Sequence, residues 1–110
     1  MKHDLVLAGG RVIDPLSGRD CIEDIAFTQG RVSGFGIGLE GAERHDVTGA
    51  IVTPGLIDLH THVYWGGTSL GVDVDAYSAK SATTTLVDTG SAGPGNFAGF
   101  RAHVIERANT

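Results

Sequence analysis

The residues best suited to chemistry in this sequence are His60 and His62, within the stretch PGLIDLHTHVY at residues 54–64. Neutral imidazoles are common ligands for zinc and other divalent metals. In an extended strand, residues i and i+2 point to the same side, so two such rings can converge on one ion. Strand histidines that bind nothing fit the same spacing, so the pair alone leaves both interpretations open.

The element that would position this pair is a strand predicted over residues 56–64. Asp58 would share one face of it with His60 and His62. The opposite face would be apolar or small, with Ile57, Leu59, Thr61 and Val63. A strand in the wall of a β/α barrel needs this division, with one face toward the helices and one inward face free for chemistry.

The residues that follow are predicted to alternate helix and strand. A short helix is expected over residues 73–82, with Asp73 or Asp75 as its N-cap. A β-branched strand is expected over residues 83–89, and then a helix over 97–108 capped by Asn96. The apolar stripe of this helix comprises Phe97, Phe100, Val104, Ile105 and Ala108. The β-α-β-α order predicts parallel strands joined by right-handed crossovers.

The first 53 residues are predicted to form short strands separated by glycines, as a small β-sandwich or sheet. Gly9-Gly10 has the composition of a hairpin turn, and residues 38–44 are expected to form a loop. After Pro54-Gly55 the predicted pattern changes from short strands separated by glycines to alternating strands and helices, so the domain boundary is placed there.

The charge composition argues against nucleic-acid and membrane partners. The 110 residues carry a formal net charge of −5 and contain no run of lysine or arginine, so neither a nucleic acid nor a membrane is expected as a partner. No apolar stretch reaches the ~18 residues of a membrane helix. The single cysteine, Cys21, cannot form an internal disulfide, and a cytoplasmic location is therefore expected.

The stretch GAIVTPGLIDLHTHVYWGG resembles the signature of the amidohydrolase superfamily, whose members are metal-dependent hydrolases on a (β/α)8 barrel. DLVLAGGRVIDPLSG resembles the small β-sandwich that accompanies that barrel. SATTTLVDTGSAGPGNFAGFRAHVIE is similar to the second βα unit of the branch containing amidohydrolase/deacetylases, dihydroorotases and D-aminoacylases. The resemblance implies a mixed α/β fold: β-sandwich strands at 1–53, then the first two βα units of a TIM-type barrel at 54–110, incomplete in this chain.

The resemblance also implies roles for particular residues. His60 and His62 would bind the more buried of one or two divalent metals, most often zinc. The water bound to the metal would attack an amide, cyclic amide or related ester of a small-molecule substrate. Asp58 is a candidate outer hydrogen-bond partner of the ligands, while Tyr64 and Asp88 are candidate pocket residues. Packing for Tyr64 and capping of loop amides for Asp88 are the competing interpretations. Ser91 lacks the surroundings of a nucleophile elbow.

A closed (β/α)8 barrel takes ~250 residues, and catalytic zinc has about three protein ligands. Two histidines therefore make an incomplete site, and this chain alone is not expected to be an active enzyme. A truncated chain, a barrel completed by a second polypeptide and an exchange of units in a homo-oligomer are all compatible with the sequence. The alternative function is a non-catalytic fragment or assembly module.

Overall fold

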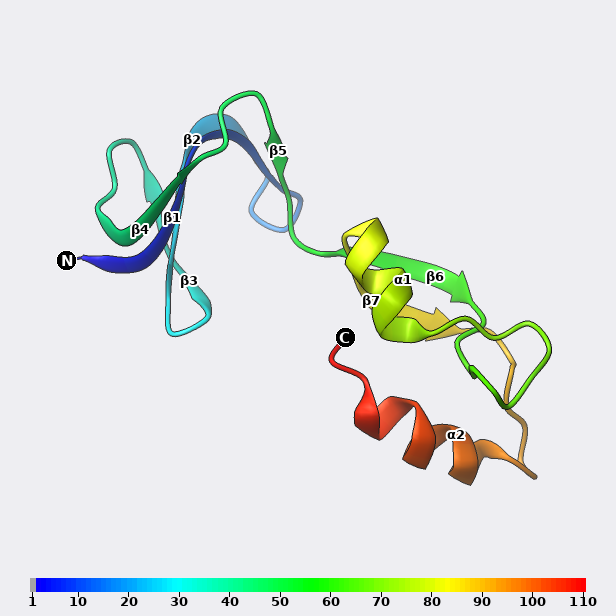
Figure 1. The fold of residues 1–110 in the computed structure, drawn as a ribbon. Coiled ribbons are helices and arrows are strands. Elements are labelled where there is room, and N and C mark those ends of the chain that lie inside the picture. Colours follow the sequence, from blue (N-terminus) through cyan, green and yellow to red (C-terminus); the bar gives the residue numbers. More distant parts are fainter. Residues whose placement is uncertain (1) are drawn as a thin grey trace. The chain divides into compact units, whose positions relative to one another are not determined.

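The computed structural model describes residues 2–110, which divide into two compact units. The first unit ends at Pro54 and the second begins at Gly55 (Figure 1). None of the helices formed by residues 2–110 is both long and apolar enough to cross a lipid bilayer.

The first unit is a single mixed sheet. Its strands are β1 (His3–Asp14), β2 (Arg19–Thr28), β3 (Arg31–Gly36), β4 (Gly41–Asp46) and β5 (Ile51–Val52). The order is β3-β2-β1-β4, and β5 also pairs with β1. The β1–β2 and β2–β3 pairs are antiparallel, whereas β4 and β5 run parallel to β1. All five strands thus belong to one sheet, which is the second of the two arrangements, a small β-sandwich or a sheet, expected for residues 1–53.

The glycine pair near the start of the chain is a bulge and not the predicted turn. β1 runs without interruption past Gly9 and Gly10, and its register against β2 shifts between Leu7 and Gly10. Gly9 has a φ of +73°, which accommodates the extra residue without a Cβ penalty. A Gly-Gly pair is compatible with both a tight turn and a β-bulge, so the residues around Gly9 and Gly10 do not show which of the two structures forms.

The prediction of a loop over residues 38–44 is also wrong for residues 41–44, which belong to a strand. Residues from Gly41 onward form β4, which pairs with β1 from His3 to Ala8. The sequence GAERHD has no apolar alternation, and all of its residues but the first are exposed. Backbone hydrogen bonds to β1 therefore hold β4 in place, and burial of its side chains contributes little.

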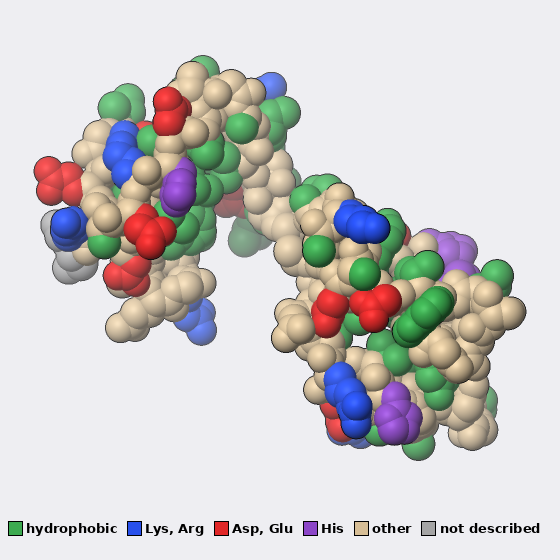
Figure 2. All heavy atoms as spheres, in the orientation of Figure 1, with side chains coloured by type: hydrophobic (Ala, Val, Ile, Leu, Met, Phe, Trp, Pro, Cys, Tyr) green, Lys and Arg blue, Asp and Glu red, His purple; other side chains and the backbone are tan. Residues whose placement is uncertain are grey.

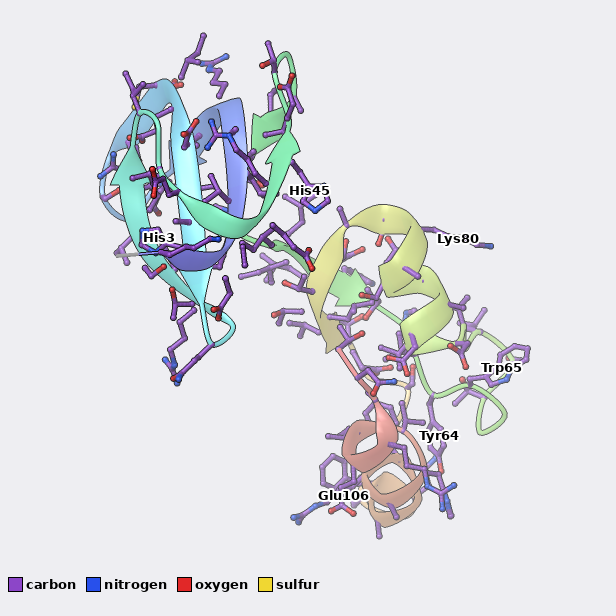
Figure 3. The ribbon with its side chains drawn as sticks, turned by 60° about the vertical axis from the view of Figure 1, so that its left-hand side comes forward. His3, His45, Tyr64, Trp65, Lys80 and Glu106 are labelled. Atoms are coloured by element: carbon purple, nitrogen blue, oxygen red, sulfur yellow. The ribbon has the colours of Figure 1, made fainter. Side chains whose placement is uncertain are left out.

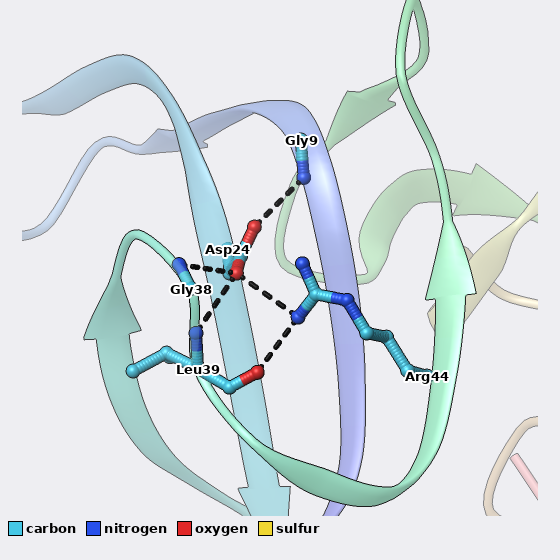
Figure 4. A network of polar contacts seen from close by, with 5 residues as sticks. All are labelled: Gly9, Asp24, Gly38, Leu39 and Arg44. Carbon is cyan, nitrogen blue, oxygen red and sulfur yellow. Dashed lines mark hydrogen bonds and ion pairs between the residues drawn. The ribbon is translucent and has the colours of Figure 1, made fainter.

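A buried carboxylate ties the first unit together (Figure 4). Asp24 on β2 is 5% exposed and accepts hydrogen bonds from the backbone nitrogens of Gly9, Gly38 and Leu39 at 3.0–3.1 Å. Arg44 on β4 donates to the same carboxylate at 3.1 Å and to the Leu39 carbonyl at 2.7 Å. This network fixes both the β1 bulge and the turn between β3 and β4.

The second unit has the predicted β-α-β-α order. Its elements are β6 (Leu56–Thr61), α1 (Val74–Ser81), β7 (Thr83–Asp88), α2 (Phe97–His103) and the 3-10 turn η1 (Ile105–Arg107). β6 and β7 pair in parallel, as predicted. Asp73 caps α1, because its Oδ1 accepts a hydrogen bond from the Ala76 nitrogen at 2.8 Å.

The final helix is shorter than the expected span of 97–108. α2 ends at His103, and a 3-10 turn follows. Asn96 occupies the N-cap position, as predicted, but its side chain makes no capping hydrogen bond and instead accepts from the Gly93 nitrogen in the preceding loop. Phe100 and Val104 are buried with Val63, and Tyr64, Val74, Leu86 and Ala92 pack against them.

The two faces of β6 differ from the expected pattern. Thr61 and Val63 are buried, as an apolar face toward the helices requires, but Ile57 and Leu59 on the same alternation are 61% and 71% exposed. No element among residues 2–110 covers these two side chains. The ladder to β7 is also irregular, with register shifts after Leu56 and after Asp58.

Candidate metal-binding site

The end of β6 brings the predicted histidine pair together. His60 is the last residue but one of the strand, and His62 follows directly after Thr61, so the strand is shorter than the predicted span of 56–64. The two ring centroids lie 5.7 Å apart with an angle of 71° between the ring planes. The rings are therefore neighbours, as the i, i+2 spacing predicts.

This separation is within reach of a single ion. An imidazole nitrogen lies about 2.0–2.1 Å from zinc, which places each ring centroid about 3.2 Å from the ion. Two rings on one ion can therefore be at most about 6.4 Å apart. The observed 5.7 Å satisfies this limit. The two imidazoles fit a divalent metal as part of a donor set, and their assignment as ligands stays a prediction.

Asp58 connects the strand that carries the pair to helix α1. Its Oδ1 accepts from the His60 backbone nitrogen at 3.1 Å, and its Oδ2 accepts from the Tyr77 hydroxyl at 2.9 Å. The hydrogen bond from His60, followed by that from Tyr77, lowers the pKa of the Asp58 carboxyl. Asp58 thus holds the backbone of His60, and sequence reasoning had not singled out Tyr77.

Asp88 is the last residue of β7 and pairs with Thr61 of β6. Its Oδ2 accepts from the Val63 nitrogen at 2.8 Å, and its Oδ1 accepts from the nitrogens of Gly90 and Ser91 at 3.1 and 2.7 Å. Burial alone would raise the pKa of Asp88, but these backbone donors and the Ser91 side chain together lower it. Asp88 therefore joins the ends of β6 and β7, and its role in a substrate pocket stays a prediction.

Ser91 is the residue nearest to the histidine pair that sequence reasoning did not assign to the site. Its hydroxyl lies 2.9 Å from Nδ1 of His62 and comes from the loop after β7. The two residues are 29 positions apart, and no spacing rule relates them. Only the parallel pairing of β6 with β7 places their ends side by side.

Tyr64 lies in the packed core of the second unit. Its ring is 5.0 Å from that of Phe100 on α2 and sits against Gly67, where any Cβ would meet the ring. Trp65 is 64% exposed and projects outward, whereas Tyr64 lies beside α2 (Figure 3). Packing is thus an observed role of Tyr64, and a role at a substrate mouth stays a prediction.

The other histidines do not join the pair. Among residues 2–110, no group of three or more histidine, cysteine, aspartate or glutamate side chains is placed to hold a metal ion. His3 and His45 belong to the first unit, where His3 contacts Ser33 at 2.8 Å (Figure 3). His103 is exposed at the end of α2, and Lys80 is exposed on α1.

Comparison with known sequences finds similarity to deacetylases and dihydroorotases. It is 41% identical over 80 residues to a deacetylase of Agrobacterium fabrum and 42% identical over 82 residues to a dihydroorotase of Citrifermentans bemidjiense. These matches cover 70% and 72% of this chain but only 20% and 19% of those proteins. The chain thus spans about a fifth of the length of these relatives. No protein-family model matches it.

Solved structures agree with the sequence matches. A dihydroorotase crystal structure superimposes with a TM-score of 0.79 at 29% identity, over 94% of this chain and 28% of that one. An N-acyl-D-glutamate deacylase from Bordetella bronchiseptica, complexed with zinc and a phosphonate inhibitor, has a TM-score of 0.60 at 26% identity, over 78% of this chain and 18% of that one. A D-aminoacylase with a binuclear metal centre has a TM-score of 0.56 at 29% identity, with the same two coverages. The chain therefore belongs to the amidohydrolase superfamily, whose deacetylases, dihydroorotases and D-aminoacylases it matches over their N-terminal portion.

Proposed function

We propose that this chain forms the N-terminal part of a metal-dependent amidohydrolase that hydrolyses an amide, a cyclic amide or a related ester. The observation that carries the proposal is the pairing of His60 and His62 at the end of β6, with ring centroids 5.7 Å apart. Its support comes from the relatives, which include deacetylases and dihydroorotases, and from a solved deacylase complexed with zinc.

In this proposal β6 and β7 are the first two strands of a (β/α)8 barrel. They run parallel and are joined through α1, as barrel strands are. The side chains of Leu56, Ile57 and Leu59 are 52–71% exposed, and hydrophobic side chains reach the visible surface of the second unit (Figure 2). An apolar groove of about 450 Å³ also runs along β7 and α2. Further barrel strands and helices, from the same polypeptide or a complementing chain, would cover these surfaces.

His60 and His62 would hold the metal in the complete enzyme. A divalent ion bound there, most simply zinc, would polarise a substrate carbonyl and lower the pKa of a bound water. Asp58 fixes the backbone of His60, while Asp88 fixes the chain just after His62 through the Val63 nitrogen. Because catalytic zinc has about three protein ligands, the rest of the donor set must come from later barrel strands.

Metal binding by the 110-residue chain tests this assignment. We expect zinc, followed by isothermal titration calorimetry at neutral pH, to bind at one site per chain. His62→Ala should weaken binding by about 100-fold or more, since loss of an outer-sphere partner alone typically costs 10–100-fold. His60→Ala should have an effect of the same size.

His103→Ala is the matched control, because His103 is an exposed histidine of the same unit that lies outside the pair. It should leave zinc affinity unchanged. Failure of the unmodified chain to bind zinc, or equal affinity of His62→Ala and the unmodified chain, would contradict the proposal and favour a non-catalytic module.

A further inference from the structure

The loop after β7 contributes a hydroxyl group to the histidine pair. Ser91 Oγ lies 2.9 Å from Nδ1 of His62, and both residues are half-buried. His62 has no other side-chain hydrogen bond among residues 2–110. A neutral imidazole carries one proton on one of its two nitrogens, and the partner of one nitrogen decides which nitrogen keeps a free lone pair.

The position of Ser91 is itself fixed by Asp88. The Ser91 backbone nitrogen donates to Asp88 Oδ1 at 2.7 Å, and the same carboxylate receives the Val63 nitrogen through Oδ2 at 2.8 Å. One aspartate thus holds Ser91 on one side and the residue after His62 on the other. These two hydrogen bonds to Asp88 hold the Ser91 hydroxyl beside the His62 imidazole.

The direction of the hydrogen bond follows from the nitrogen that a metal can reach. Ser91 Oγ occupies Nδ1 of His62, so Nε2 is the ring nitrogen left for an ion. A neutral imidazole that binds a metal through Nε2 carries its proton on Nδ1. His62 then donates from Nδ1–H, and the Ser91 oxygen accepts.

We propose that Ser91 is a positioning residue that holds His62 in the Nδ1–H tautomer and thereby makes its Nε2 a metal donor. This inference rests on the proposed function, because it assigns the serine a role toward the metal held by His60 and His62. By hydrogen-bonding the ring nitrogen that does not face the metal, Ser91 orients the His62 ring and fixes which nitrogen carries the proton.

The tautomer of His62 in metal-free protein provides the first test. Two-bond proton–nitrogen NMR spectra of the ¹⁵N-histidine-labelled chain at pH 8 distinguish the two neutral tautomers. We expect His62 to show the Nδ1–H form in the unmodified chain and in Ser91→Thr, which retains a hydroxyl. Ser91→Ala should lose this preference. A predominantly Nε2–H form in the unmodified chain would overturn the proposal without any variant being needed.

Zinc affinity provides the second test, again by calorimetry. Ser91→Ala should bind zinc about 10–100-fold more weakly, and Ser91→Thr should restore most of the affinity. Ser81→Ala is the control, because it removes a hydroxyl that bonds only the Tyr77 carbonyl on α1. If the unmodified chain binds zinc through His62 while Ser91→Ala binds equally well, only the role of Ser91 fails. If the unmodified chain binds no zinc, the proposed function itself fails.

Discussion

Asp24→Asn is expected to destabilise the first unit by about 3 kcal/mol, because hydrogen bonds to a buried carboxylate and its ion pair with Arg44 are lost together. The Asp24 carboxylate is 5% exposed and receives three backbone nitrogens and the Arg44 guanidinium. A neutral amide places an N–H group where at least one of these donors points. Urea unfolding followed by the NMR amide signals of Gly9 and Gly38 measures the loss directly.

The same carboxylate makes the stability of the first unit depend on pH. Burial alone would raise the pKa of Asp24, but the Leu39 and Gly9 nitrogens and Arg44 together lower it below its ordinary value. The folded state therefore binds this proton less readily than the unfolded chain. Its contribution is complete above the unfolded pKa of about 3.9 and is lost as pH falls through the lower folded value.

Asp20→Asn is the matched control for this prediction. Asp20 also pairs with an arginine, Arg11, at 2.7 Å, but both side chains are about half exposed. Solvent screens such a pair, so its loss should change the urea midpoint little. An equal effect of the two substitutions would contradict the assigned role of the Asp24 network. So would a stability difference between Asp24→Asn and the unmodified chain that stays constant as pH falls through the folded pKa of Asp24.

The order of elements in the second unit could be predicted from the sequence because each one carries a local signal. The β-branched run after Ser81, the cap at Asp73 and the apolar positions of the last helix all acted over a few residues, and β7, α1 and α2 formed where they indicated. The end of the last helix has no such local signal, and a contact between residues distant in the sequence lies near it. Asp75 accepts hydrogen bonds from Asn109 and Thr110, and this tether accompanies the change from α-helix to 3-10 turn after Val104.

The first unit shows where local signals fail. β4 has an exposed, polar sequence and exists because β1 offers it a parallel edge. The bulge at Gly9 is specified by the carboxylate of Asp24, which lies 15 residues away in the sequence. Pairing and long-range hydrogen bonds decided both features, and neither has a periodicity that a sequence pattern could reveal.

The candidate site divides in the same way. The i, i+2 spacing placed the rings of His60 and His62 side by side, since strand geometry is local. The contacts that hold them were not visible in the sequence. Tyr77 reaches Asp58 from the crossover helix, and Ser91 reaches His62 from the next loop, because β6 and β7 are parallel neighbours. The hydrogen-bond partners of these candidate ligands are thus harder to predict from the sequence than the histidine pair itself.

The loop that follows His62 depends on close contact between two backbone segments, and this makes Gly71 a sensitive position of the second unit. A Cβ at Gly71 would overlap the Tyr64 carbonyl group and lie 2.8 Å from the Trp65 nitrogen. The next residue, Val72, donates its nitrogen to the His62 carbonyl at 3.0 Å. Any displacement at Gly71 is therefore passed to the backbone of a predicted metal ligand.

Gly71→Ala is expected to destabilise the second unit by about 3 kcal/mol, because rigid backbone cannot move aside as a flexible side chain does. Trp65 is the only tryptophan of the chain and lies in this loop, so its fluorescence during urea unfolding reports the second unit alone. Gly95→Ala is the control, since nothing lies within 4 Å of its Cβ position, and its effect should stay within about 0.5 kcal/mol. Unchanged stability of Gly71→Ala would mean that the loop does not close against Tyr64. A loss confined to Gly71→Ala, together with weaker zinc binding, would link the closure of this loop to the geometry of the histidine pair.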